Sequence, residues 1–464
     1  MKRSLLFCIA LIFLGTTPSC SSGGNETTVK NFRLPKPGVI HERISGFVDK
    51  DISYALYLPA GCGENKAVYP VIIAFDPGAS GLRPVKIYRE LADQYGFILL
   101  GSNDSKNGQP GNLTSKFITG LLAEVHEVYP VDTNRIYVAG FSGGSRAATI
   151  AAMFHSEVKG VIGCGAGFPV GAQPPSYKFD YFGIAGTADF NLNEMVQLNE
   201  ILSQLGLRHF ITTFPGPHAW PPAGVMEEGF QWITLNAMKD GTMKRNDTVI
   251  NRIMSRFDSR ISGAKSENHL IAAAEACREA IQFAEGLIST DHFNNELRTL
   301  EQLPEYKKQA AYRAQILKKE ADEQQLLMNA IFTKGEAWWK KRVSRMDSQH
   351  MMGLNPEDTL MNARLKTFLS LVCYSNANEA MKQHDPDLAK KVIAIYEIAD
   401  QQNPEPNFMR AIILVQQNDT TAAVKQLETA VGKGFSDKSR MMQQSDFEAL
   451  KNSPAYFDLL HKMK

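Results

Sequence analysis

The chain has 464 residues, of which 44% are hydrophobic and 21% are charged. This composition is typical of a folded globular protein with two or three domains, and it excludes a disordered chain. The 50 Lys and Arg residues against 49 Asp and Glu residues give a formal net charge of +1, with no long basic run. The charge therefore offers no electrostatic footprint for nucleic acid, and we expect no nucleic-acid partner.

Residues 1–19 are expected to form an export signal. Lys2 and Arg3 precede an apolar segment that is too short to span a bilayer. Cys20 then follows Thr17-Pro18-Ser19, which resembles a bacterial lipoprotein signal, although Thr17 and Pro18 depart from the usual pair; an ordinary secretory signal is the alternative. The resemblance implies lipidation of Cys20, a tether over residues 20–33, and a location at the outer membrane, on its periplasmic face or at the cell surface, held only by the lipid anchor.

The cysteines indicate neither a metal site nor a disulfide framework. Cys8 and Cys20 belong to the signal, and the other four are scattered without a C-x-x-C pair or zinc-ligand spacing. Those four, which are Cys62, Cys164, Cys277 and Cys373, are expected to be buried free thiols; disulfide pairing of some of them in an exported chain is the alternative. We expect no metal and no organic cofactor.

Residues 34–238 alternate between short apolar runs and segments of helix length. This alternation predicts a mainly parallel sheet covered by helices, which is an α/β fold. The run 51–58 alternates in polarity and is predicted to be an antiparallel edge strand. The remaining predicted strands are 67–75, 96–102, 135–140, 158–164, 179–185 and 209–214, and the predicted helices between them include 85–95, 113–129 and 192–205.

Residues 239–464 are expected to form a second, all-helical domain. The stretch 255–371 is rich in Ala, Glu, Gln, Lys and Leu, which favours long helices. From about residue 375 the pattern of Val392, Tyr396, Ala399 and Pro404 resembles a tetratricopeptide repeat, and it recurs at Ala423, Leu427 and Ala430. That recurrence is shorter than the usual period of about 34 residues. Such helices are either a structural appendage or a docking surface for a protein partner or a polymer.

The stretch Val138–Ala148, "VAGFSGGSRAA", places Ser142 between a predicted strand and a predicted helix. In that setting G-x-S-x-G forms a tight turn that exposes a nucleophilic serine, and Gly140 and Gly144 supply the lack of bulk that the turn needs. The same turn aims the Gly143 N–H at the oxygen of a reacting carbonyl. We therefore predict that Ser142 is a nucleophile and Gly143 an oxyanion donor.

A nucleophilic serine needs a base, and the base needs an acid that orients it. Asp189 follows the predicted strand 179–185 and His218 follows the predicted strand 209–214, so both should lie at the sheet edge that carries Ser142. Other candidates are weaker: His209 begins a strand, His126 and His155 lie on helices, and Glu194 lies one turn into a helix. For Asp189 the alternative role is a helix N-cap.

The segments "YALYLPAG", "YPVIIAFDPGASG", "GFSGGS", "GTADFN" and "GPHAWP" together resemble the α/β-hydrolase superfamily over residues 34–238. They are most similar to polyhydroxybutyrate depolymerase-like, feruloyl-esterase-like and dienelactone-hydrolase-like enzymes. The resemblance implies Ser142 as nucleophile, Asp189 as acid and His218 as base. Such esterases usually carry His-Gly where this chain has Asp76-Pro77, and Pro77 has no N–H to donate. The N–H of Gly78 or Ala79 is expected to complete the oxyanion hole.

These observations predict an exported serine esterase. Because no helical cap is inserted between the predicted strands, the open site suits an ester carried on a polymer or an ester of a bulky alcohol. The polar segment from Asn103 to Gly108, with Asn103 and Asp104 named first, is expected to line the site. Trp220 is expected to stack on a sugar or an aromatic acyl group, with plain packing in the core as the alternative. A serine peptidase and a catalytically inactive scaffold acting through its helical repeats are the alternatives. Because every predicted site residue precedes residue 240, the catalytic domain is expected to need nothing from the helical half for chemistry.

Overall fold

The computed structural model describes residues 33–63, 67–169, 174–351 and 355–463. The predicted export signal, Cys20 and the tether up to residue 32 lie outside the described residues. Among the helices that are described, none combines the length and the apolar character that a membrane span requires.

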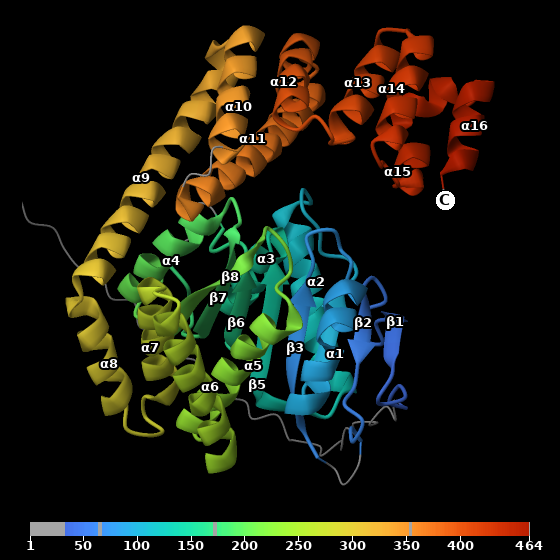
Figure 1. Cartoon of the computed structure of the whole chain (residues 1–464). Helices are drawn as coiled ribbons and strands as arrows, with labels where there is room; N and C mark the ends of the chain where they lie inside the picture. The colour runs from blue at the N-terminus through green and yellow to red at the C-terminus, as the bar shows by residue number, and fades with distance from the viewer. Residues whose placement is uncertain (1–32, 64–66, 170–173, 352–354, 464) are drawn as a thin grey trace, which may run out of the picture.

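A single eight-stranded sheet forms the centre of the molecule, with strand order β1-β2-β4-β3-β5-β6-β7-β8 (Figure 1). Strands β3 to β8 run parallel to one another, while β2 is antiparallel to both of its neighbours. The central strands carry long runs of buried residues, such as Ile136–Phe141 of β5, because helices cover both faces of the sheet. The strands are β1 (Ile40–Ser45), β2 (Ser53–Tyr57), β3 (Tyr69–Phe75), β4 (Ile98–Ser102), β5 (Val131–Phe141), β6 (Val158–Cys164), β7 (Asp180–Ala188) and β8 (His209–Pro217).

The prediction that residues 51–58 form an edge strand is wrong. Strand β2 lies between β1 and β4, and all five of its residues are buried. Its polar groups tolerate burial because each has a partner: the Ser53 N–H donates to Asp104, and the Tyr57 hydroxyl donates to Asp93 at 3.1 Å. The edge is β1, which the sequence analysis did not identify.

Two helices cover one face of the sheet and three cover the other. Helices α1 (Leu82–Tyr95) and α5 (Ala223–Lys239) share a core with one face, and α2 (Gly111–Val128), α3 (Gly143–Phe154) and α4 (Leu192–Gln204) share a core with the opposite face. The parallel strands, the single antiparallel strand β2 and the helices between successive strands define the α/β-hydrolase fold. The predicted α/β class is confirmed.

The chain after α5 is helical. Helices α6 (Asp247–Ser266), α7 (Leu270–Ala284) and α8 (Asp291–Gln302) continue the core of the sheet, since Phe182 of β7, Trp232 of α5 and Phe283 of α7 pack together. The predicted boundary at residue 238 thus falls inside one continuous hydrophobic core. The remaining helices are α9 (Pro304–Thr333), α10 (Glu336–Met351), α11 (Pro356–Lys382), α12 (Pro386–Ala399), α13 (Glu405–Gln416), α14 (Thr420–Gly432), α15 (Lys438–Gln443), η1 (Ser445–Leu450) and α16 (Pro454–Lys462).

Helices α9 to α12 form a further core and α13 to α16 another. In Figure 1 these helices extend beyond the same end of the sheet at which α11 approaches β7. The residues that carry the repeat pattern are buried: Val392, Tyr396 and Ala399 on α12, and Ala423, Leu427 and Ala430 on α14. The assignment of these helices to the tetratricopeptide class stays a prediction.

Candidate active site

Ser142 lies in the sharp turn between β5 and α3, with backbone angles φ 54° and ψ −122°. This positive φ is rare for a residue with a side chain and is typical of strained functional turns. Two close backbone approaches hold the turn. A Cβ at Gly140 would meet the Gly144 carbonyl oxygen at 2.1 Å, and a Cβ at Gly144 would meet the Phe75 carbonyl oxygen at 2.0 Å. Both positions therefore require glycine, as the sequence indicates.

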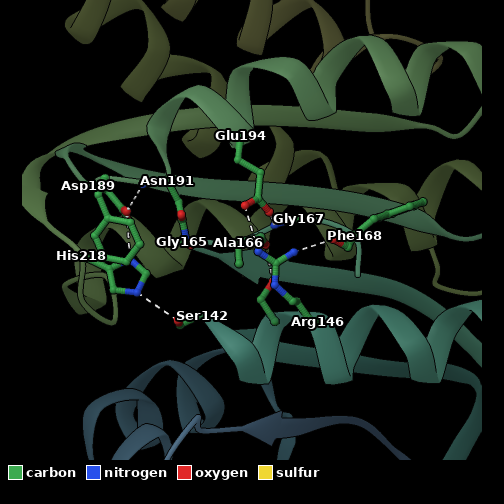
Figure 2. Close-up of polar contacts among 12 residues, drawn as sticks. Ser142, Arg146, Gly165, Ala166, Gly167, Phe168, Asp189, Asn191, Glu194 and His218 are labelled. Carbon is green, nitrogen blue, oxygen red and sulfur yellow. Dashed lines mark hydrogen bonds and ion pairs between the residues drawn. The ribbon is translucent and has the colours of Figure 1, made fainter. Parts of the chain in front are cut away.

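The structure brings Ser142, His218 and Asp189 together in hydrogen-bonding order (Figure 2). His218 Nδ1 lies 2.8 Å from Asp189 Oδ1, and His218 Nε2 lies 3.0 Å from Ser142 Oγ. With Nδ1 protonated and donating to the carboxylate, Nε2 is free to accept from the serine hydroxyl. Asp189 is 1% exposed and His218 is 15% exposed, so the acid is enclosed while the base faces the surface.

Aromatic rings hold the imidazole on both sides. The His218 ring centroid lies 4.2 Å from that of Phe190 and 4.6 Å from that of Phe141. Phe141 directly precedes the serine and Phe190 directly follows the acid. The same two turns that present Ser142 and Asp189 therefore also restrict the orientation of His218.

The loop after β6 packs directly against Asp189 and His218. Gly165 has φ +65°, and a Cβ there would lie 2.9 Å from Asp189 Oδ2 and 3.2 Å from His218 Cε1. Asn191 ties this loop to the acid turn, because its backbone N–H donates to Asp189 Oδ1 at 2.8 Å and its side chain donates to the Gly165 carbonyl at 2.7 Å. The sequence analysis named neither residue.

Glu194, which the sequence analysis set aside as a possible acid, has a different role. Its carboxylate accepts from Arg146 at 2.8 Å and from the Gly167 N–H at 2.8 Å, and Arg146 also donates to the Phe168 carbonyl (Figure 2). Glu194 thus links α3, α4 and the loop after β6.

Trp220 does not offer a stacking surface for substrate, contrary to the prediction. Its side chain is buried, its ring packs against Tyr88 and Phe141, and its indole N–H donates to Asp76 Oδ2 at 2.8 Å. Asp76 occupies the position where similar esterases carry histidine, and it is 2% exposed. The Asp76–Trp220 pair joins the loop after β3 to the loop that bears His218.

The turn after β3 uses both of the predicted second oxyanion donors. The Gly78 N–H donates to Asp76 Oδ1 at 2.9 Å, and the Ala79 N–H donates to the Asp76 carbonyl at 3.0 Å. Both N–H groups therefore already donate to Asp76. The prediction that Gly78 or Ala79 completes the oxyanion hole does not fit this geometry. The Gly143 N–H, by contrast, has no hydrogen-bond acceptor within the described part of the chain.

Asn103 and Asp104 hold loops together and do not line the site, contrary to the prediction. Asn103 Oδ1 accepts from the Gly81 N–H at 3.2 Å, and Asp104 accepts from Ser53 of β2. Asn107, farther along the same loop, reaches the serine turn: a Cβ at Gly143 would fall 1.6 Å from Asn107 Oδ1. The Asn107 side-chain amide thus occupies the space beside Gly143 and has no hydrogen-bond partner among the described residues.

The loop that carries Asn107 is fixed against the turn after β3. The Asn107 N–H donates to the Pro77 carbonyl at 2.9 Å, and Lys106 forms an isolated β-bridge with Gly78. The only sequence signal for Asn107 was its place in a polar segment after a strand that ends at the active edge.

Cys164, at the end of β6, is not a competing nucleophile. Burial, with the Asp189 carboxylate nearby, raises the pKa of its thiol far above the usual value. No group of three or more His, Cys, Asp or Glu side chains in the described ranges is arranged to hold a metal ion.

Ser142, His218 and Asp189 thus lie in hydrogen-bonding order at one edge of an α/β-hydrolase sheet. No family model and no curated protein matches the chain. Among solved structures, an S-formylglutathione hydrolase from Staphylococcus aureus is 13% identical, with a TM-score of 0.36, and the match covers 43% of this chain and 99% of that one.

An esterase from Pyrobaculum calidifontis is 15% identical, with a TM-score of 0.35 over 44% of this chain and 85% of that one. A ferulic acid esterase is 18% identical, with a TM-score of 0.34 over 42% of this chain and 96% of that one. All three matches span less than half of this chain. At these scores the similarities carry no information on substrate.

Proposed function

We propose that this protein is an exported serine hydrolase that cleaves carboxylic esters through Ser142, His218 and Asp189. The observation that carries the proposal is the continuous hydrogen-bond chain from the enclosed Asp189 carboxylate through His218 to the hydroxyl of a strained serine. This order and these distances are those of a nucleophile activated by an oriented base.

The proposed reaction follows from the geometry. His218 Nε2 takes the proton of Ser142 as Oγ attacks the ester carbonyl carbon, and Asp189 stabilises the imidazolium that forms. When the tetrahedral intermediate collapses, the bond to the alcohol oxygen breaks and His218 returns the proton to that oxygen. Water then attacks the acyl-enzyme with His218 again as base, which releases the acid and restores Ser142.

The oxyanion of the intermediate needs two donors, and we assign them to the Gly143 N–H and the Asn107 side-chain amide. The Gly78 and Ala79 N–H groups already donate to Asp76, while the Asn107 side chain lies beside Gly143 and has no hydrogen-bond partner among the described residues. The donor is Nδ2, which lies 3.0 Å from a Cβ built on Gly143, farther than Oδ1 at 1.6 Å, and rotation of the amide exchanges the two atoms. One such donor contributes about 3 kcal/mol to transition-state stabilisation. With this assignment the oxyanion hole has two donors, although the turn that carries Asp76-Pro77 offers none.

Labelling of the purified full-length protein with a fluorophosphonate probe tests the proposal. We expect stoichiometric labelling of the wild type and none of Ser142→Ala, and we expect Ser142→Ala to lose about 10⁶-fold in turnover of p-nitrophenyl acetate while keeping its fold. A panel of acetyl, feruloyl and longer acyl esters, with the matching amides, then separates an esterase from a peptidase. A folded wild type that is neither labelled nor active would favour the scaffold alternative.

We also propose that Cys20 carries a lipid anchor, and that the helices from α12 onward dock a protein partner or a polymeric substrate. The sequence around Cys20 supports the first proposal and the buried repeat pattern the second. Loss of fatty-acid labelling in Cys20→Ser tests the anchor. Equal labelling of wild type and variant would remove it.

A further inference from the structure

The helical region contacts the turn that carries Asp189. Arg364 of α11 donates through Nη1 to the carbonyl oxygen of Thr187 at 2.6 Å. Thr187 lies at the end of β7, two residues before Asp189. A residue that is distant in the chain therefore forms a hydrogen bond to the backbone that positions the proposed acid.

Arg364 is held rigidly for this contact. Its side chain is 1% exposed, and it forms a bidentate pair with Glu320 of α9, which is fully buried. Arg364 Nε lies 2.8 Å from Glu320 Oε1, and Arg364 Nη2 lies 2.5 Å from Glu320 Oε2. Since a buried ion pair of this kind is seldom more stabilising than a well-packed apolar pair, stability alone does not account for it.

Helix α9 adds two longer contacts on the other side of the acid. Gln324 Nε2 lies 3.4 Å from the Phe190 carbonyl oxygen, and Asn193 Nδ2 lies 3.5 Å from the Leu317 carbonyl oxygen. Helix α11 thus contacts Thr187, which precedes Asp189, and α9 contacts Phe190, which follows it. Phe190 also packs on the His218 ring, so a shift of this turn would move both the acid and a wall of the base.

We propose that Arg364 is a positioning residue for the reaction: paired with Glu320, it holds the Thr187 carbonyl and thereby keeps Asp189 in register with His218. This inference rests on the proposed function and makes the helical region part of the catalytic unit. A displacement of about 1 Å in a catalytic group can cost roughly 10²-fold in rate. Loss of the clamp should therefore lower kcat, while KM for a small ester is unchanged because no substrate contact is lost.

The test uses the full-length protein and the double variant Glu320→Leu/Arg364→Met, which removes both charges and fills the space with apolar side chains. We expect cooperative thermal unfolding, a KM for p-nitrophenyl acetate within twofold of wild type, and a kcat about 10- to 100-fold lower. The fluorophosphonate labelling rate should fall in parallel. The matched control is Arg313→Met/Glu275→Leu, which removes another α9 ion pair, at 2.6 Å, away from the acid turn. The control should keep wild-type kcat.

Arg364→Lys provides a second measurement that does not depend on folding of the double variant. Lysine keeps a positive charge opposite Glu320. Its ammonium lacks the planar fork of donors with which the Arg364 guanidinium bonds Glu320 and the Thr187 carbonyl at the same time. We expect a kcat between those of the wild type and the double variant. Wild-type kcat in folded Arg364→Lys and in the double variant, or an equal loss in the control, would overturn the inference. A wild type that fails to react with the probe would instead refute the proposed function itself.

Discussion

Asn107 lies beside Gly143, the residue that follows Ser142, and we have proposed these two residues as the oxyanion donors. We predict that Asn107→Ala lowers kcat for p-nitrophenyl acetate about 10²-fold, because it removes one of two oxyanion donors. KM and the unfolding temperature should stay near wild type, since Asn107 is exposed and its amide holds no other group. Lys106→Ala, at the adjacent exposed position, is the control and should keep wild-type kcat.

Gly143→Ala gives an independent check on the same donor. The new Cβ would fall 1.6 Å from Asn107 Oδ1 and push the amide aside, which a flexible exposed side chain permits without unfolding. We expect a loss of kcat similar to that of Asn107→Ala, and little further loss when the two changes are combined. A kcat within twofold of wild type in Asn107→Ala would exclude the assignment.

Residue by residue, the sequence was most informative where a short motif dictates its own geometry. Gly140, Ser142 and Gly144 are confirmed as a tight strand–turn–helix, and Asp189 and His218 lie within hydrogen-bonding distance as their strand order predicts. Trp220, Asn103 and Asp104 were misjudged because their partners, Asp76, Gly81 and Ser53, are distant in the chain. Long-range pairing of this kind leaves no local pattern in a single sequence.

At the scale of helices, α5, α6 and α7 meet at a cluster of three ionisable side chains, of which Glu279 is buried and Arg260 reaches the surface. Arg260 of α6 lies 3.0 Å from both Glu228 of α5 and Glu279 of α7. Glu279 is 1% exposed. Burial and the neighbouring Glu228 charge raise the pKa of Glu279 well above its usual value, against the opposing effect of Arg260. The folded state thus holds a proton that the unfolded state has released.

The sign of the pH dependence follows from that difference. Above the unfolded pKa of Glu279 the native state binds more protons than the unfolded state, so the free energy of unfolding falls as pH rises toward the folded pKa. Glutamine is permanently neutral and avoids this loss, which is about 1.4 kcal/mol for each unit of pKa difference. We predict that Glu279→Gln becomes progressively more stable than wild type between pH 5 and pH 8, as measured by urea unfolding.

Glu275→Gln is the control for this measurement. Glu275 lies on the same helix, is partly exposed and also pairs with an arginine. Its replacement leaves Glu228, Arg260 and Glu279 in place, so a pH-dependent gain in stability that is specific to Glu279→Gln belongs to that cluster. A Glu279→Gln protein that is less stable than wild type by a constant amount at both pH values would contradict the prediction.

The order of helices and strands along the chain was predictable from the alternation of apolar runs. Which strands lie next to one another in the sheet was not. The helices and strands of the sheet region lie close to their predicted ranges. Strand β2 was misplaced at the edge because its alternating polarity is typical of a half-exposed strand, whereas Ser53 and Tyr57 satisfy their polar groups inside. Burial of all four described free cysteines, by contrast, is confirmed.

For the whole molecule, the continuous core changes the expectation for truncation. A fragment that ends at Asp240 would leave Trp232 without Phe283, whose ring centroid lies 5.2 Å away, and would expose the apolar surface that α6 to α8 cover. We predict that this fragment aggregates or unfolds at low denaturant concentration. A fragment of residues 33–302 keeps α6 to α8 and should unfold cooperatively, as measured by circular dichroism.

The longer fragment should nevertheless hydrolyse p-nitrophenyl acetate with a kcat about 10- to 100-fold below that of the full chain, because it lacks α9 and α11. Full activity in either fragment would restore the expectation that residues before 240 suffice for chemistry. That expectation arose because every proposed catalytic residue precedes the helical region. A supporting contact such as Arg364 to Thr187 leaves no local pattern in the sequence.

Arg364 and Thr187 are 177 residues apart along the chain. Chains are synthesised from the N-terminus at roughly 5–20 residues per second. His218, the last residue of the proposed triad, precedes Arg364 by 146 residues, so the whole triad exists roughly 7–29 seconds before the arginine that we propose as its positioning residue. A growing chain with this arrangement carries the whole proposed triad before α11 has been made and docked, and we expect it to hydrolyse esters about 10- to 100-fold more slowly until then. The full catalytic rate then arrives only near the end of biogenesis.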